Sequence, residues 1–204
     1  MGEAARSTLE MILDVVIQEI DLRDENHVRM VAVAKAVGIS EPALYHYFRN
    51  REDMITAAHV RRFRANLSIT IDPFIAATRN CQSREEFAAV VRGVYKHAFG
   101  KDREWARALR AELVAGSTRR DTLRTKLAEE IDLSLADTIT ELEYAKSRGW
   151  LSSELDPRAF ALFNLSLISS LVYAELYGDE LVLEHWKKIA LTAVTSLVLA
   201  ETIL

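Results

Sequence analysis

The sequence predicts an all-α protein of about nine helices, with a small N-terminal three-helix unit followed by a larger helical domain. Half of the 204 residues are hydrophobic, yet only 7 are Gly and 3 are Pro. So few helix-breaking residues, combined with many Ala, Leu, Glu and Arg, favour helices. Apolar residues also recur every three or four positions along most of the chain, which is the spacing of a helix with one buried face.

The first helix is expected from about residue 5 to 22. Its buried stripe is formed by Leu9, Leu13, Val16 and Ile20, which recur at helical spacing. A charged connection follows at residues 21–27. This helix is expected to cover the two helices after it and to complete a three-helix unit.

The next two helices are expected at residues 29–37 and 41–47, on either side of Gly38-Ile39-Ser40. A Gly after a helix closes it through a left-handed residue, and Ser40 is a good N-cap for the helix that follows. Two short helices joined by such a turn form a helix-turn-helix, whose second helix enters the DNA major groove. The alternative is a helical hairpin that only fills a core. Tyr45, His46 and Tyr47 argue against it, because a helix this short cannot bury three consecutive rings.

The fourth helix is expected from Asn50, its N-cap, to about Ile71, where Asp72-Pro73 should break or bend the chain. Further helices are expected at residues 84–100, 102–115, 120–148, 157–177 and 179–202. The last two are apolar almost all round, so each must be buried on more than one side. We therefore expect a homodimer through a four-helix bundle, two helices from each chain, although a monomer with these helices at its centre is the alternative. The expected interface residues are Phe160, Leu167, Leu171, Trp186, Val194 and Leu197.

The run GISEPALYHYFRNREDM closely resembles the DNA-binding segment of the TetR family of bacterial transcriptional regulators. The matching residues are Gly38, Ile39, Ser40, Leu44, Tyr45, Tyr47, Phe48 and Arg51. The likeness is specific over about fifty residues and only architectural beyond them. It implies a helix-turn-helix DNA-binding domain at residues 1–50, a linking helix from residue 51, and an effector-binding and dimerisation domain at residues 51–204. One departure is Val31, which stands where the family often has a hydroxyl residue and cannot make a polar contact with DNA.

The resemblance also assigns roles within this segment. The expected DNA-binding residues are Arg29, Ser40, Glu41, Pro42, Ala43, Tyr45, His46, Tyr47, Arg49 and Arg51. Tyr45, Tyr47 and Arg51 are expected to bind phosphate, with help from His46. Glu41, Pro42 and Ala43 project from the start of the helix and are expected to read bases. Glu41 has two open interpretations: it accepts a hydrogen bond from a cytosine amino group, or it only repels some operators.

An effector cavity is expected within about residues 65–178, again by resemblance. The candidate ligand-binding residues are aromatic or polar side chains on otherwise apolar faces, and each has ordinary core packing as its alternative. They are Phe63, Tyr95, Phe99, Trp105, Leu109, Glu112, Tyr144 and Phe163. If Glu112 points inward, it favours a cationic or hydrogen-bonding ligand.

The charge of the chain is unfavourable for DNA binding. The net charge is −4, and residues 1–64 contain slightly more acidic than basic side chains. Binding to DNA depends on neutralising phosphates, so nonspecific affinity should be weak and strongly salt-dependent. The competing hypothesis is therefore a TetR-like protein-binding module with little or no DNA affinity.

Other functional classes find little support. The single cysteine, Cys81, excludes an internal disulfide framework and a multi-cysteine metal site. No phosphate loop, nucleophile elbow or H-E-x-x-H motif is present, so we expect no enzyme, no cofactor and no metal. Residues 1–6 do not resemble a signal peptide, and the apolar stretch 161–177 is interrupted by Asn164, several Ser and Glu175. The expected protein is a cytoplasmic repressor, free of the membrane, that binds a palindromic DNA operator as a dimer and is released by a small apolar or amphipathic effector.

Overall fold

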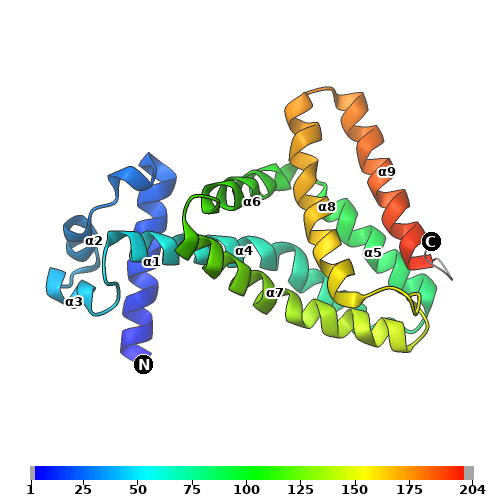
Figure 1. Cartoon of the computed structure of the whole chain (residues 1–204), viewed down its shortest axis with the longest axis horizontal. Helices are drawn as coiled ribbons and strands as arrows, with labels where there is room; N and C mark the ends of the chain where they lie inside the picture. Colours follow the sequence, from blue (N-terminus) through cyan, green and yellow to red (C-terminus); the bar gives the residue numbers. More distant parts are fainter. Residues whose placement is uncertain (1–2, 200–204) are drawn as a thin grey trace. The chain divides into compact units, whose positions relative to one another are not determined.

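The computed structural model describes residues 3–199, and within them it contains helices and no strand, which confirms the all-α prediction (Figure 1). The elements are α1 (Glu3–Arg23), η1 (Glu25–His27), α2 (Met30–Val37), α3 (Glu41–Tyr45), α4 (Arg51–Thr78), α5 (Arg84–Ala98), η2 (Lys101–Arg103), α6 (Glu104–Ser117), α7 (Asp121–Ser147), α8 (Pro157–Tyr177) and α9 (Glu180–Leu199), where η marks a short 3-10 helix. The expected end of the last helix at residue 202 lies outside the described residues.

The chain forms two compact units. The first contains residues up to Ala65 together with Ser117–Ala128, and the second contains Asn66–Gly116 and the chain from Glu129 onward. The first unit is therefore larger than the segment 1–50, since it includes the start of α4 and the start of α7. Both of these helices contribute residues to both units.

The core of the first unit lies between α1, α2, α3 and the beginning of α4. Ile12 and Val16 of α1, Leu44 of α3 and Met54 and Ile55 of α4 are all 0% exposed. Ile12 and Val16 are four positions apart on α1, the helical spacing that the sequence predicts, and Met54 and Ile55 are adjacent in α4. Burying side chains of this size stabilises the unit by about 1.5–3 kcal/mol each. The small unit thereby holds α2 and α3 in fixed positions.

Helix α4 continues through Pro73 to Thr78, so the predicted end near Ile71 and a break at Asp72-Pro73 are wrong, whereas a bend there stays a prediction. Proline inside a helix loses one backbone hydrogen bond and costs about 3 kcal/mol. The two residues that follow, Phe74 and Ile75, are both buried in the core of the second unit. Their burial is worth about as much as the proline costs, which explains why packing overrides the local signal.

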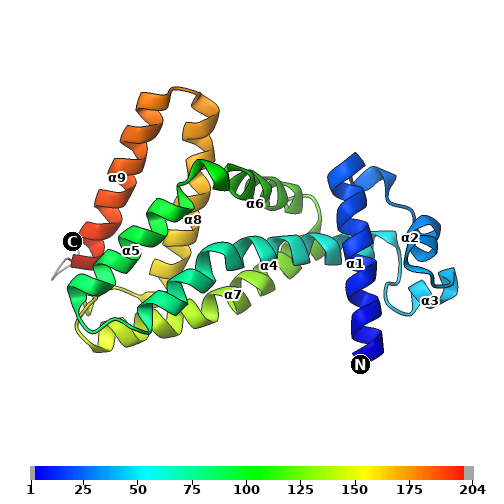
Figure 2. The same cartoon turned by 180° about the vertical axis from the view of Figure 1, so that it is seen from behind.

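The second unit is a bundle of α5, α6, α8 and α9 with parts of α4 and α7 (Figure 2). Helix α8 has the predicted bounds, because Asp156 accepts the Ala159 N–H at 2.6 Å and Gly178 ends the helix with φ 78°. Helices α8 and α9 run side by side in opposite directions, and α5 packs along α9 (Figures 1 and 2). Aromatic rings fill the interior, including Phe87 against Trp150 at a centroid distance of 6.1 Å.

Helix α8 has two different faces. Phe160, Ala161, Ile168, Leu171 and Ala174 are buried in the core of the second unit. The outer side carries exposed apolar residues that continue onto α9. We call this set the α8–α9 outer face: Leu162, Phe163, Tyr173, Leu176, Tyr177, Leu181, Val182 and Ile189. Among the described helices, α8 is the one long and apolar enough to cross a bilayer by length and composition, a test that core helices of folded proteins also pass.

Candidate DNA-binding surface and effector pocket

The turn between α2 and α3 has the predicted geometry. Gly38 takes the left-handed conformation with φ 79°, and the next amide, from Ile39, donates to Ala34 O at 3.0 Å. A residue with a side chain would be strained at this φ, so glycine suits the position. Ser40 Oγ then accepts the Ala43 N–H at 3.3 Å and starts α3.

Helix α3 ends at Tyr45, two residues earlier than predicted. The amide of Tyr47 donates to Leu44 O at 3.0 Å, a three-residue spacing that tightens the last turn. This tightening allows both Leu44 and Phe48 to reach the core of the first unit. The helix thus ends before the predicted residue 47, although the Phe48 amide still donates to Leu44 O at 3.1 Å.

The outer side of α3 carries the predicted reading residues. Pro42, Tyr45 and His46 are exposed, and the Tyr45 ring is 50% exposed. Glu41 and Ala43 are half-buried, and Tyr47 is half-buried against the core of the first unit. A short helix with two exposed rings and a proline at its first turn is thus available for contact with a partner.

The basic residues near α3 have partners within the protein. Arg49 donates from Nε and Nη2 to the Asp53 carboxylate at 3.2 Å. These hydrogen bonds, together with the opposite charges, lower the pKa of Asp53 and raise the pKa of Arg49. Arg51 donates from Nε to Val28 O at 2.8 Å and from Nη2 to Glu25 O, and the exposed Arg29 donates to Val28 O at 3.1 Å. The phosphate contacts of these three residues stay a prediction.

The first unit also contains a network of charged side chains around the buried His59. Glu25 in η1 contacts His59 Nε2 at 2.7 Å and accepts a hydrogen bond from Arg120 Nη1 at 3.0 Å. Burial lowers the pKa of His59, and the hydrogen bond with Glu25 only partly opposes this shift. For Glu25 burial acts to raise the pKa, but His59 and Arg120 outweigh it, so the net pKa is lowered. Sequence reasoning missed these residues because nothing local relates positions so far apart in the chain.

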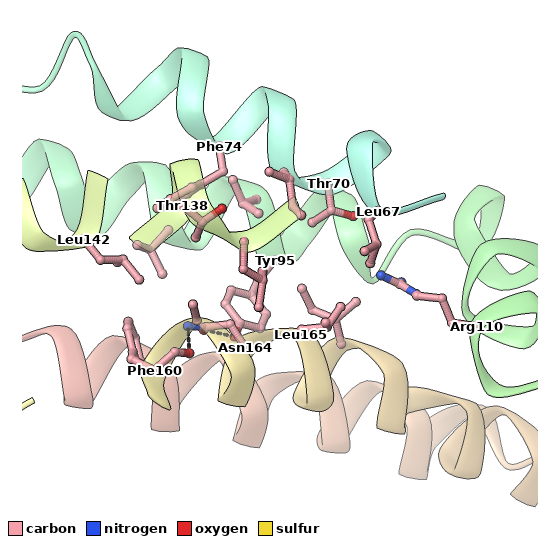
Figure 3. Close-up of a pocket in the computed structure, with 16 residues that line it drawn as sticks. Leu67, Thr70, Phe74, Tyr95, Arg110, Thr138, Leu142, Phe160, Asn164 and Leu165 are labelled. Atoms are coloured by element: carbon pink, nitrogen blue, oxygen red, sulfur yellow. Dashed lines mark hydrogen bonds between the residues drawn. The ribbon is translucent and has the colours of Figure 1, made fainter. Parts of the chain in front are cut away.

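The second unit contains an apolar cavity of about 70 Å³ (Figure 3). Its walls come from α4, α5, α6, α7 and α8, and most of the lining is aliphatic or aromatic, including Leu67, Phe74, Leu142 and Phe160. The polar lining residues are Thr70, Tyr95, Arg110, Thr138 and Asn164. The Tyr95 hydroxyl donates to Asn164 Oδ1, and Asn164 Nδ2 donates to Phe160 O at 2.6 Å. A mostly apolar cavity with a few polar groups is the usual form of a small-molecule site.

Comparison with known proteins agrees with the geometry of the first unit. Residues 12–58 match the model of the bacterial regulatory proteins of the tetR family. The chain carries the DNA-binding domain of the TetR family. Comparison with curated proteins finds no match.

Solved structures extend the TetR-like fold to nearly the whole chain. A protein from Rhodococcus sp. described as a TetR-family transcriptional regulator is 19% identical, with a TM-score of 0.66 over 94% of this chain and 98% of that one. The TetR-family regulator from Cytophaga hutchinsonii is 12% identical, with a TM-score of 0.65 over 98% of each chain. The regulator FadR from Bacillus subtilis, solved with stearoyl-CoA, is 19% identical, with a TM-score of 0.55 over 92% and 97%. At these identities the likeness establishes the fold alone.

Within this TetR-like fold, only one of the predicted effector residues lines the cavity, namely Tyr95. Phe99 is buried beside it, with ring centroids 5.3 Å apart, and Leu109 is half-buried. The remaining candidates lie elsewhere: Phe63 is buried in the first unit, whereas Trp105, Glu112, Tyr144 and Phe163 are exposed. Because the side chain of Glu112 faces solvent, the condition for a cationic ligand is not met.

The polar residues of the cavity that sequence reasoning missed are Thr70, Arg110, Thr138 and Asn164. The available signal was the spacing of Arg107 and Arg110, three apart in the otherwise apolar-faced α6, which places both on one side of the helix. Both are nearly fully buried, at 1% and 4% exposed. Two arginines on the buried side of a helix require an explanation, since arginine is rarely buried without a partner.

The predicted interface residues divide into two groups. Phe160, Leu171 and Val194 lie in the core of the second unit, because they face α5 and the cavity side of the bundle. Leu167, Trp186 and Leu197 are half-buried against that core. The periodicity of a helix that is apolar all round does not distinguish its inner face from its outer one. The exposed apolar surface is instead the α8–α9 outer face.

Metal and redox chemistry have little support in the part of the chain that the structure describes. It contains no group of three or more His, Cys, Asp or Glu side chains that could hold a metal ion. Cys81 is buried, and burial raises the pKa of its thiol, with a smaller contribution from Glu86. A buried thiol with a raised pKa is a poor nucleophile at neutral pH.

Proposed function

We propose that the protein is a cytoplasmic, non-enzymatic transcriptional repressor that binds a palindromic DNA operator as a homodimer and is released by an amphipathic effector. The observation that carries this proposal is the turn at Gly38, which joins α2 to a short α3 with Pro42, Tyr45 and His46 exposed. The match of residues 12–58 to the TetR family supports the same function.

On DNA, the two copies of α3 are expected to enter successive major grooves about 34–36 Å apart. Glu41, Pro42 and Ala43 occupy the first turn of α3 and are the proposed base-reading residues. Glu41 accepts a hydrogen bond from a cytosine amino group, and Pro42 or Ala43 packs on a thymine methyl. Tyr45, Tyr47 and His46 are the proposed phosphate contacts.

The proposed dimer forms through the α8–α9 outer face. This surface presents large apolar side chains on two neighbouring helices, with Tyr173 at 75%, Leu176 at 83% and Leu181 at 75% exposed. Exposed apolar areas of this kind are usually covered by a partner. A second copy is the proposed occupant, because two adjacent antiparallel helices can pair with their own copy about a two-fold axis as a four-helix bundle.

The proposed release mechanism depends on helices that the two units share. Both α4 and α7 contribute residues to the DNA-binding unit and to the unit with the cavity. A ligand in the cavity changes DNA affinity only if it binds the DNA-free arrangement of these helices more tightly than the DNA-bound one. The effector therefore has to alter the packing of α4 or α7 where they line the cavity.

The first experiment is selection of genomic fragments by the purified full-length protein at low salt. Wild type should enrich one palindromic sequence, and Tyr45→Ala should lose it because the exposed ring is removed without disturbing the core. Trp105→Ala, which removes an exposed ring from the second unit, is the matched control and should retain the site. If Glu41→Ala recovers the same site with unchanged affinity and base preference, Glu41 does not read a base.

The dimer has its own test. Leu176→Glu should convert the protein to a monomer in sedimentation velocity and strongly weaken operator binding. Leu133→Glu introduces the same charge at an α7 residue that is 67% exposed, so it should leave the dimer intact. If Leu176→Glu still sediments as a dimer, the α8–α9 outer face is not the interface.

The second candidate function is a protein-binding module with a TetR-like fold. It is favoured by the internal hydrogen bonds of Arg51, the ion pair of Arg49 with Asp53, and the apolar Val31, which is 60% exposed at the start of α2. Failure of the wild-type protein to enrich any fragment over Tyr45→Ala would favour this function.

A further inference from the structure

Arg110 is a buried cation with unused hydrogen-bond donors. Its side chain is 4% exposed, and Nε and Nη1 have no hydrogen-bond partner in the part of the chain that the structure describes. Burying a guanidinium without an acceptor is unfavourable, and native proteins rarely leave such a group unpaired. Arg110 therefore requires either an explanation in the fold or a partner from outside.

The neighbouring Arg107, in the same helix, has hydrogen-bond acceptors for its guanidinium. It donates to the carbonyls of Ala98 and Gly100 and forms an ion pair with Glu175. No carboxylate takes this position for Arg110. Burial lowers the pKa of Arg110 to about 10, with the charge of Arg107 adding to the shift. This value still leaves Arg110 charged at neutral pH, so an uncompensated positive charge lies inside the second unit.

Arg110 lines the apolar cavity, and Figure 3 shows it at one end, with Leu142 and Phe160 at the opposite end. The Thr138 hydroxyl, which also lines the cavity, is a second buried polar group without a partner among the described residues. The Tyr95 hydroxyl is already engaged by Asn164. The described lining of the cavity thus combines a cationic end at Arg110, the buried hydroxyl of Thr138 and a long apolar wall.

We propose that the cavity binds a short- or medium-chain carboxylate, with the carboxylate paired to Arg110 and the apolar body lying along Leu142 and Phe160. This inference deepens the proposed function, on which it rests for the identification of the cavity as the effector site. Nε and Nη1 point to different sides of the guanidinium, so each can donate on its own. A carboxylate that accepts a charge-assisted hydrogen bond from one of them would neutralise the buried charge. The small volume of about 70 Å³ favours a short chain or a single ring over a long-chain acid, whose entry would have to displace lining side chains.

Binding is measured on the full-length protein without DNA, by isothermal titration calorimetry and thermal unfolding at neutral pH. The probes are the linear acids from butanoate to decanoate, with octanamide as a neutral match for octanoate and octyl phosphate as an alternative anion. At least one acid should raise the melting temperature of the wild-type protein. Octanoate should bind at least about tenfold more tightly than octanamide, because only the charged head pairs with Arg110.

Three variants test the role of Arg110. Arg110→Met removes the charge and should abolish the effect of the acids, whereas Arg110→Lys keeps the charge and should retain weakened binding. Arg158→Met removes an exposed arginine of α8 and should bind as wild type does. Arg110→Met should be at least as stable as the unliganded wild type, since it removes an uncompensated buried charge. If it fails to fold, the comparison of octanoate with octanamide on wild type and on Arg110→Lys decides.

Several results would overturn the proposal: no shift with any acid, equal affinity for octanoate and octanamide, or unchanged octanoate binding by Arg110→Met. If octyl phosphate binds as tightly as octanoate, the site is selective for apolar anions in general and not for carboxylates. Because these measurements use no DNA, carboxylate binding can succeed while operator binding fails. Conversely, enrichment of a palindromic operator without any carboxylate binding would leave the proposed regulator intact and reject this ligand.

Discussion

Arg120 donates a hydrogen bond from Nη1 to the carboxylate of Glu25 at 3.0 Å, although 95 positions separate the two residues. Arg120 directly precedes α7, and Glu25 lies in η1, just before the helix-turn-helix. Arg120 also donates from Nε to Glu52 at 2.8 Å, at the start of α4. One side chain therefore links the start of α7 to two elements of the DNA-binding unit.

This ion pair should contribute measurably to stability. The two side chains are 22% and 38% exposed, so we expect a coupling energy of only about 0.5–1 kcal/mol. Urea unfolding of Glu25→Gln, Arg120→Met and the double variant would give this value as a double-mutant cycle. Purely additive single effects would show that the contact contributes nothing.

The burial of His59 predicts a fall in stability at acidic pH. The pKa of His59 is lowered in the folded protein, chiefly by burial, so the folded state favours the neutral ring. The unfolded chain takes up a proton as the pH falls through about 6.5, and the folded state is destabilised in proportion. The lowered pKa of Glu25 acts in the same direction at lower pH.

Melting temperatures measured by circular dichroism between about pH 7 and pH 5 should therefore decrease, and His59→Gln should flatten this dependence. His46→Gln replaces an exposed histidine of the same unit and should keep the wild-type slope. A slope that His59→Gln leaves unchanged would assign the pH dependence to other groups.

Asp53 should limit the DNA affinity of the wild-type protein. Its carboxylate neutralises Arg49 through two hydrogen bonds of 3.2 Å from the guanidinium. Asp53→Asn keeps the shape of the side chain but removes the charge, so operator affinity should rise by about two- to tenfold at low salt and less at high salt. Fluorescence anisotropy with the selected operator measures this effect. Asp132→Asn gives the same change in net charge in the second unit, and an equal gain from it would exclude a local role of Arg49.

Gly38 and Gly93 both have room for a Cβ atom but differ in backbone conformation. A Cβ on either residue meets no atom within 4 Å, but only Gly38 has a positive φ, of 79°. Gly38→Ala should cost about 1–2 kcal/mol of unfolding free energy through backbone strain. Gly93→Ala, inside α5, should instead stabilise the protein by about 0.5–1 kcal/mol, because alanine restricts the unfolded chain. Urea unfolding of both variants gives the comparison, and similar signs for the two would contradict the role of φ at Gly38.

The sequence predicts local features of the fold well. The turn at Gly38, the N-caps Ser40 and Asp156, and the bounds of α8 depend on residues within a few positions of each other, and the structure contains all of them. Local signals failed where burial outweighed them. Pro73 remains inside α4, where the next two residues, Phe74 and Ile75, are buried in the core of the second unit.

The sequence by itself determined the helical class and the helix-turn-helix, because periodicity and capping act over one or two turns of chain. Only the tertiary structure decided which apolar faces point inward, as with Phe160 in the core and Tyr173 on the surface. It also decided the partners of the charged residues: Arg51 meets carbonyl oxygens more than twenty positions away, Glu112 faces solvent, and Arg110 is buried without an acceptor. The periodicity of a helix shows that one face is buried. It does not show which element covers that face, because the covering element comes from a distant part of the chain.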